Sequence, residues 1–142
     1  MLKELKRQLY KWKVAKKNRT LRKKLYENQR VVVHETAIGF HNVFFEGENS
    51  VPERCQFLGK EIKIGYRTTL GKNNLLAGKV SIGKYCQIGV DVAMHASNHP
   101  TTMMTKYINR NLFQGELKNF LVKKEIKIGN DVWIGHGAII VG

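Results

Sequence analysis

Three features are scarce in this 142-residue sequence, and the first two each argue against a class of protein. Two cysteines are too few for a disulfide framework. No long apolar run is present, which argues against a transmembrane helix and against the hydrophobic core of a secretory signal. Acidic residues number 11 against 25 Lys and Arg, for a net charge of +14. We therefore expect a cytoplasmic protein with reduced thiols, and the length predicts a single domain.

A spacing of six residues organises the middle of the chain. Seven apolar residues share this spacing: Leu58, Ile64, Leu70, Leu76, Ile82, Ile88 and Met94. Glycine follows five of them directly: Gly59, Gly65, Gly71, Gly83 and Gly89. A period of six fits neither an α-helix nor an alternating strand. It is typical of a solenoid, in which each short unit turns a corner and stacks on its neighbours.

A second row of small or β-branched residues lies four positions after each anchor, where it fits a narrow coil. Its members are Ile62, Thr68, Asn74, Val80, Cys86 and Val92. The anchor row resumes later in the chain at Ile128, Ile134 and Ile140. We expect a weaker earlier copy, with a slip of two residues near Pro52, at Val32, Ile38 and Phe44. These rows predict a buried core, in which Cys86 is an inert thiol.

The hexapeptide pattern resembles that of the left-handed parallel β-helix acyltransferases, the hexapeptide-repeat superfamily, over about residues 32–142. The resemblance implies a mainly β fold in which three six-residue units form one triangular coil. The chain is then expected to divide into a left-handed β-helix domain over 31–142 and, before it, a basic helical arm over 1–30. The six-residue rhythm disappears between Met94 and Ile128, which predicts a loop insertion at 95–127.

Three segments around this insertion resemble, in the same order, the O-acetyltransferases of that superfamily: Ile82–Gly89, Asn98–Pro100 and Ile128–Gly135. Galactoside and maltose acetyltransferases, xenobiotic acetyltransferases and capsular polysaccharide O-acetyltransferases share this order. The capsule and cell-surface glycan group is the closest. The resemblance implies acetyl transfer from acetyl-CoA to a hydroxyl of a cell-surface or capsular glycan, or of its precursor. Transfer to an amino sugar is a close variant.

The resemblance implies roles for six residues. His99 is the expected general base, since imidazole accepts a proton near neutral pH and returns it in the same cycle. The expected substrate contacts are Asn98, Tyr107 and Trp133, and the expected coenzyme contacts are Gly135 and His136. His95 is expected to line the loop, because the surrounding repeat argues against a helix that would align it with His99.

Aromatic and amide side chains in residues 101–122 suit a sugar acceptor, although an ordinary surface loop explains them equally. The superfamily's trimers imply a homotrimer in which this loop reaches a neighbouring subunit and the site forms between chains. Relatives continue past the position of Gly142, so a C-terminally truncated chain is expected. A non-catalytic truncated β-helix scaffold is therefore one alternative.

A metalloenzyme similar to the γ-class carbonic anhydrases is the other alternative. Such a zinc site needs three protein ligands and an open position. The three histidines in question lack the spacing of that family: His95, His99 and His136. We therefore expect no metal.

The positive charge is concentrated in residues 1–30, which carry 12 Lys or Arg and two Glu, a net charge of +10. Four apolar residues recur there at helical spacing: Leu2, Leu5, Leu9 and Trp12. They predict an amphipathic helix over residues 1–17, and a second short helix or turn is expected over 21–26. The arm has three candidate roles: a cap on the first coil, peripheral membrane contact through residues 1–27, or nucleic-acid binding. The last is disfavoured, because no nucleic-acid motif or basic stripe with aromatics follows.

Overall fold

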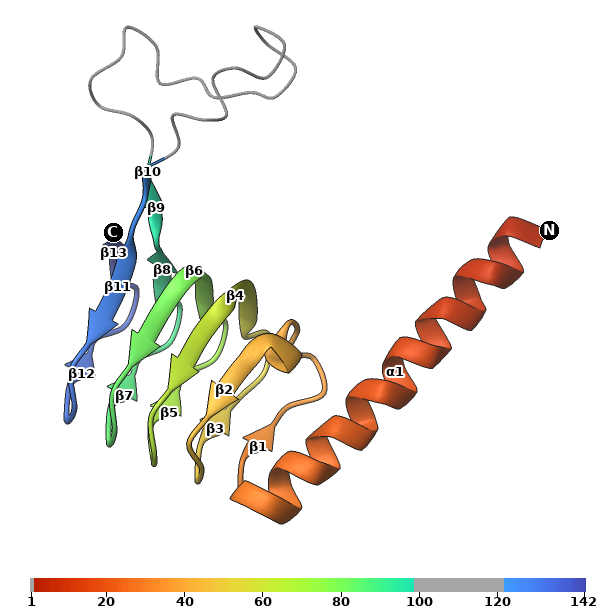
Figure 1. Cartoon of the computed structure of the whole chain (residues 1–142), viewed down its shortest axis with the longest axis horizontal. Coiled ribbons are helices and arrows are strands. Elements are labelled where there is room, and N and C mark those ends of the chain that lie inside the picture. The colour runs from red at the N-terminus through yellow and green to blue at the C-terminus, as the bar shows by residue number, and fades with distance from the viewer. Residues whose placement is uncertain (1, 99–121) are drawn as a thin grey trace, which may run out of the picture.

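The computed structural model describes residues 2–98 and 122–142, which form one helix followed by a stack of mostly parallel strands (Figure 1). Helix α1 spans Leu2–Gln29, and a 3-10 turn, η1, spans Phe40–Asn42. The strands are β1 (Val32–Val33), β2 (Val43–Phe45), β3 (Ser50–Val51), β4 (Gln56–Ile64), β5 (Thr69–Leu70), β6 (Leu75–Ile82), β7 (Gln87–Ile88), β8 (Ala93–His95), β9 (Ser97–Asn98), β10 (Val122–Lys123), β11 (Glu125–Ile128), β12 (Trp133–Ile134) and β13 (Ile139–Val141). The predicted mainly β fold with parallel strands and an N-terminal helix is confirmed.

The strand pairings arrange the chain as a coil with three sides. Side A consists of β1, β3, β5, β7 and β12. Side B consists of residues 56–58, residues 75–77, β8 and β13. Side C consists of β2, residues 61–64, residues 79–82 and β11. Leu70 pairs with Ile88 and Ile64 with Ile82, both 18 positions on, so one coil comprises three six-residue units.

The same strand registers give the length of the insertion between sides B and C, here called the excursion. Ile82 pairs with Ile128, which is 46 positions on, or one 18-residue coil plus 28 inserted residues. Both ends of this insertion are strands in the structure, because β8 continues to His95 and β10 and β11 precede Ile128. The segment predicted as a loop over 95–127 therefore contains strand residues at each of its ends.

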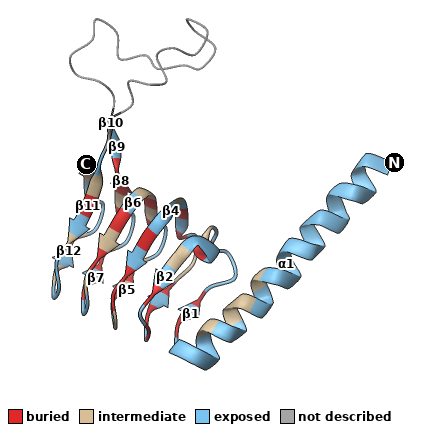
Figure 2. Cartoon of the chain, in the orientation of Figure 1, coloured by how far each residue is buried: buried red, intermediate tan, exposed pale blue. Residues whose placement is uncertain are grey.

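The second predicted row is buried from Ile62 to Val92: Ile62, Thr68, Asn74, Val80, Cys86 and Val92 are at most 1% exposed. Its predicted continuation, Val132 and Ala138, is partly buried against the core. The anchor row is buried from Ile64 to Met94 (Figure 2). Three buried polar or thiol side chains at one corner bond the backbone of the following coil. Asn49 Nδ2 donates to the Gly65 carbonyl at 2.7 Å, Thr68 Oγ1 to Gly83 at 2.6 Å, and Cys86 Sγ to Gly129 at 3.0 Å. Such bonds offset the cost of burying polar groups.

The predicted phase of the first coils is wrong by one residue. The predicted inward residues Val32, Ile38, Phe44 and Leu58 are 49–60% exposed. The residues that point inward are Val33, Phe45, Val51 and Phe57. The cause is a β-bulge in β4: Leu58 pairs with Ala77 and Glu61 with Lys79, so two residues oppose one. The predicted two-residue slip near Pro52 is instead a one-residue insertion at Gly59–Lys60.

Helix α1 is one continuous element of 28 residues, and only its last turns contact the stack. Leu21 and Leu25 pack against the core, and the Glu48 amide donates to the Gln29 carbonyl at 2.7 Å. The predicted apolar stripe is 50–69% exposed: Leu2, Leu5, Leu9 and Trp12. The interpretation of this stripe as a cap on the first coil is therefore wrong, because Leu21 and Leu25 take that role. Among the described residues, no helix is long and apolar enough to cross a membrane.

An exposed polar cluster lies beside the junction between α1 and the stack. The Tyr66 hydroxyl donates to Glu48 Oε1 at 2.6 Å, and Arg67 Nε donates to Glu48 Oε2 at 2.6 Å. The bond from Tyr66, followed by that from Arg67, holds the pKa of the Glu48 carboxyl below its usual value. The same carboxylate raises the pKa of Tyr66. The ionised form of Glu48 is therefore the one that the folded state favours.

Close stacking at the corners predicts different responses to two glycine substitutions. A Cβ on Gly71 would overlap the carbonyl group of Gly89 in the next coil, whereas one on Gly129 meets nothing within 4 Å. We expect Gly71→Ala to lower the free energy of unfolding by about 1–3 kcal/mol, as overpacking does. Gly129→Ala is the matched control and should change the free energy of unfolding by less than about 0.5 kcal/mol. Urea denaturation measures both, and equal effects would contradict the stacking.

The Glu48 cluster predicts a pH-dependent contribution to stability. A carboxyl with a lowered folded-state pKa stabilises the fold above its unfolded-state pKa, and this contribution is lost as the pH falls through the folded-state value. Glu48→Gln should therefore lower the Tm at about pH 7, and lower it by less at about pH 3. The exposed Glu35 supplies the control variant, Glu35→Gln. A Tm difference that is the same at both pH values would exclude the ionised carboxylate as its source.

Candidate functional site

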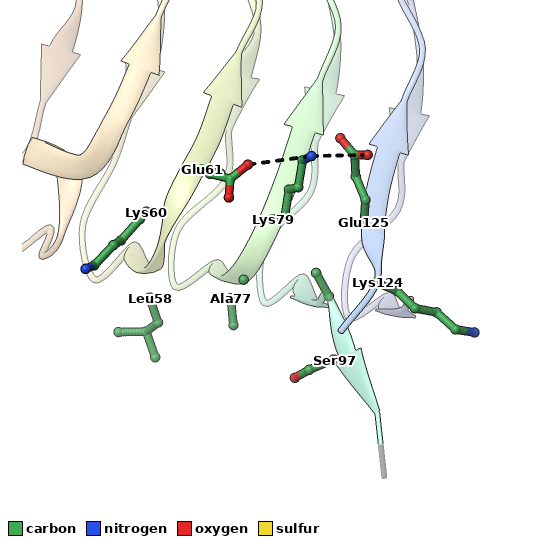
Figure 3. Close-up of a pocket in the computed structure, with 10 residues that line it drawn as sticks. Leu58, Lys60, Glu61, Ala77, Lys79, Ser97, Lys124 and Glu125 are labelled. Atoms are coloured by element: carbon green, nitrogen blue, oxygen red, sulfur yellow. Dashed lines mark ion pairs between the residues drawn. The ribbon is translucent and has the colours of Figure 1, made fainter. Parts of the chain in front are cut away.

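A groove of about 680 Å³ runs along the corner between sides B and C (Figure 3). It crosses three successive coils, because its walls come from β4, from β6 and from the strands that flank the excursion. Its apolar lining includes Leu58, Ala77 and Ala96. Leu58 lies here because the β4 bulge follows it directly, and bulges commonly redirect side chains at sheet corners and sites.

Charged side chains line the groove in two arrangements. Lys79 Nζ lies 3.5 Å from Glu61 Oε2 and 3.7 Å from Glu125 Oε2, so one row of ion pairs links three coils (Figure 3). Within the part of the chain that the structure describes, the other two lysines of the groove, Lys60 and Lys124, have no ion-pair partner. The groove thus combines an apolar lining with two uncompensated positive charges, a combination suited to an anionic ligand with an apolar segment.

The excursion leaves and rejoins the stack beside this groove. Strand β9 pairs antiparallel with β10, with Asn98 opposite Val122 and Ser97 opposite Lys123. Ser97 lines the groove, and Lys124 lines it on the returning strand. This short hairpin therefore anchors both ends of the excursion at the groove, on the same rigid scaffold.

The predicted site residues occupy two different parts of the coil. Asn98 lies on β9, beside the corner between sides B and C. Trp133 lies on side A, paired with Gln87 and 75% exposed, and Gly135 and His136 follow it toward the corner between sides A and B. In Figure 1, β12 lies at the lower edge of the stack and the β9–β10 hairpin at its upper edge. The structure thus brings Trp133, Gly135 and His136 together but separates them from Asn98 within one chain.

The predicted histidines and Tyr107 are placed by the structure only in part. His99 and Tyr107 lie outside the described residues. His95 lies in β8, paired with Ala77 and with Val141, and not in the loop where it was expected. His136 is largely exposed, with Nε2 3.9 Å from Asp91 Oδ2.

The groove itself was missed by sequence reasoning. Its signal is a break in the count of six: the inward residues Phe57 and Ile64 are seven positions apart. Such a break marks an inserted residue, and an insertion in a coil of fixed length has to be accommodated at a corner. The exposed Leu58 and the neighbouring Lys60 follow from that insertion.

Metal and thiol chemistry have little support at the described residues. Among them, no group of three or more His, Cys, Asp or Glu could hold a metal ion. The buried Cys55 thiol donates to the Gly71 carbonyl at 3.3 Å, and desolvation raises the pKa of this thiol. A protonated, buried thiol is a poor nucleophile, so Cys55 serves the packing.

Comparisons with protein-family models, with curated proteins and with solved structures gave no match.

The geometry described above gives a candidate site that consists of two surfaces of this chain. One is the groove between sides B and C with the β9–β10 hairpin beside it. The other is the exposed surface formed by Trp133, Gly135 and His136.

Proposed function

We propose that this chain is an acetyltransferase that transfers the acetyl group of acetyl-CoA to a hydroxyl of a cell-surface or capsular glycan or its precursor. The observation that carries the proposal is the groove at the base of the excursion, because Ser97 lines it and the expected base, His99, follows two positions later. In this proposal the stack is a left-handed β-helix of the hexapeptide type. The 18-residue coil of three six-residue units supports that assignment.

The proposed reaction needs one proton acceptor and no covalent enzyme intermediate. His99 accepts the proton of the acceptor hydroxyl as its oxygen attacks the thioester carbonyl carbon. The C–S bond then breaks, and the imidazolium returns the proton to the departing thiolate. The products are an acetyl ester and free coenzyme A. A positioned base of this kind contributes about 10²–10⁴-fold to the rate.

The groove offers suitable contacts for the acyl donor. Leu58 and Ala77 would contact the flexible apolar part of the donor, and Lys60 and Lys124 would attract its phosphates. The expected coenzyme contacts Gly135 and His136, however, lie at another corner of the coil. In the proposed enzyme both surfaces serve one site, which requires the corner of a second copy to face the groove.

Side B has an apolar outer surface, as expected for an interface between copies of the chain. Its outward residues are largely apolar: Ile38, Leu58, Leu75, Ala77, Ala93, Ile139 and Val141, with Gln56 and His95 as the polar members. Ile38, Leu58, Ile139 and Val141 are 49–74% exposed. The corresponding positions on the other sides are mainly polar, with Ser50, Thr69 and Gln87 on side A and Lys63, Ser81 and Lys127 on side C. The apolar exceptions there are Val32 and Trp133 on side A and Phe44 on side C. Apolar patches of this kind mark protein–protein contacts.

A cyclic trimer with side B toward its axis would cover the apolar surface of side B and would also bring a second copy to face the groove. In that arrangement the corner between sides B and C of one chain lies beside the corner between sides A and B of the next. The groove and the β9–β10 hairpin of one copy would then face Trp133 and His136 of another. The separation of these residues within one chain supports a homotrimer with three sites between subunits.

The proposed trimer predicts that a charge added to side B disrupts assembly more than a charge added to side A. Ile139→Lys should convert the trimer to monomers, because burying an unpaired ammonium group in the interface is costly. Ser50→Lys, which adds the same charge to side A, should leave the trimer intact. Light scattering coupled to size-exclusion chromatography measures the mass of each. A monomeric parent chain, or equal behaviour of the two variants, would contradict the arrangement.

The catalytic role predicts a separation between donor binding and turnover. His99→Ala should lower the transfer rate by about 10²–10⁴-fold, because the variant loses the base. Its acetyl-CoA affinity, measured by calorimetry, should stay within about twofold of the parent value, since the base contributes to the reaction and little to donor binding. The exposed His34 supplies the control, His34→Ala, which should retain both properties. Well-folded trimers that do not bind acetyl-CoA would instead favour the scaffold alternative.

A further inference from the structure

The first half of α1 extends away from the stack with no contact to it. All residues from Leu2 to Lys17 are exposed, a length of about 24 Å at the rise of an α-helix (Figure 2). The contacts with the stack come later, where Leu21 and Leu25 pack on the core and Arg22 lies over the Phe40 ring at 5.9 Å.

Two apolar stripes lie on nearly opposite faces of this helix. At 100° per residue, Leu2, Leu5, Leu9 and Trp12 occupy an arc of about 80°. The direction of this arc differs by about 160° from that of Leu21 and Leu25. The face that Leu2, Leu5, Leu9 and Trp12 form, here called the outer stripe, therefore points away from the packed face, and no other described element covers it.

The charges around the outer stripe are almost all positive. Residues 2–19 contain eight Lys or Arg and one acid, Glu4, which pairs with Arg7 at 2.9 Å. By the same helical angle, Lys6 and Lys13 flank the stripe on one side and Arg19 on the other. An apolar stripe with Leu and Trp between basic flanks fits the boundary between acyl chains and anionic headgroups.

The other possible occupants fit less well. In a coiled coil between copies, the spacing of the outer stripe continues to Lys16 and Arg19, which would place charges in the seam. The net charge of +7 on residues 2–19 would also repel the same segment of a second copy. Nucleic acid would attract the charges but leave the leucines exposed.

We propose that the outer stripe of α1 docks this protein on anionic lipid bilayers. The helix lies in the membrane plane, with Leu5, Leu9 and Trp12 between the acyl chains. Lys6, Lys13 and Arg19 contact the headgroups. The stack stays outside the bilayer, because Leu21 and Leu25 hold it on the other face of the helix.

Cosedimentation of the full chain with vesicles tests this proposal. The parent should bind mixed phosphatidylglycerol–phosphatidylcholine vesicles, bind pure phosphatidylcholine weakly, and dissociate as salt is added. Leu5→Ser with Leu9→Ser should reduce the partition coefficient by about tenfold or more, because two apolar side chains no longer enter the bilayer. The control variant, Tyr10→Ser with Val14→Ser, removes two apolar residues from the other face of the same segment. It should change the partition coefficient by less than about twofold.

Three results would overturn the proposal. The first is no binding to the anionic vesicles by folded protein, and the second is an equal loss in both double variants. The third is tighter binding to duplex DNA than to vesicles at the same salt concentration, which would assign the basic arm to nucleic acid. In a Trp133→Phe background, a blue shift of Trp12 emission on vesicle addition would further support insertion of the outer stripe.

Discussion

Backbone hydrogen bonds between successive coils repeat every 18 residues, and the rest of the structure has to conform to that interval. Thr69 and Leu70 pair with Gln87 and Ile88, and the same spacing continues along sides B and C. Neighbouring coils lie as close as paired strands, at about 4.8 Å. The space inside admits one layer of side chains, and several corners admit only glycine. Additional residues are therefore tolerated only where they leave the stack.

The two departures from this interval lie at the same corner. One is the bulge at Gly59–Lys60, and the other is the excursion that begins after β9 and ends at β10. The first turns Leu58 outward, and the second adds Ser97 and Lys124 to the same corner, beyond Ala77, so that the groove results from both. A repetitive scaffold has few irregular places, and an irregular corner with uncompensated lysines is where a ligand site is best accommodated.

The interval also explains which features could be predicted from the sequence. The inward residues from Ile62 to Met94 were predicted correctly because no insertion interrupts the count of six there. The first coils were assigned one residue out of phase for two reasons. The one-residue bulge takes Leu58 out of the inward row, and the predicted two-residue slip moved Val32, Ile38 and Phe44 one residue too far. Helix α1 was divided in two because its apolar residues change face between Trp12 and Leu21, although the backbone continues as one helix. Helical periodicity identified the stripe but not the face that packs.

The candidate site was harder to predict because its parts are not linked by the repeat. Trp133 lies on side A, and the six-residue rhythm carries no information on which corner meets a neighbouring copy. The proposed trimer joins the two surfaces, and it has a consequence for the helix. Cyclic symmetry would place all three copies of α1 at one end of the assembly, so that three weakly bound arms would act on one surface with increased avidity. The groove begins at β4, in the coil next to the one on which α1 packs, and extends away from α1 to the strands beside the excursion. The same trimer would therefore bind a membrane at one end and keep its three sites accessible along its length.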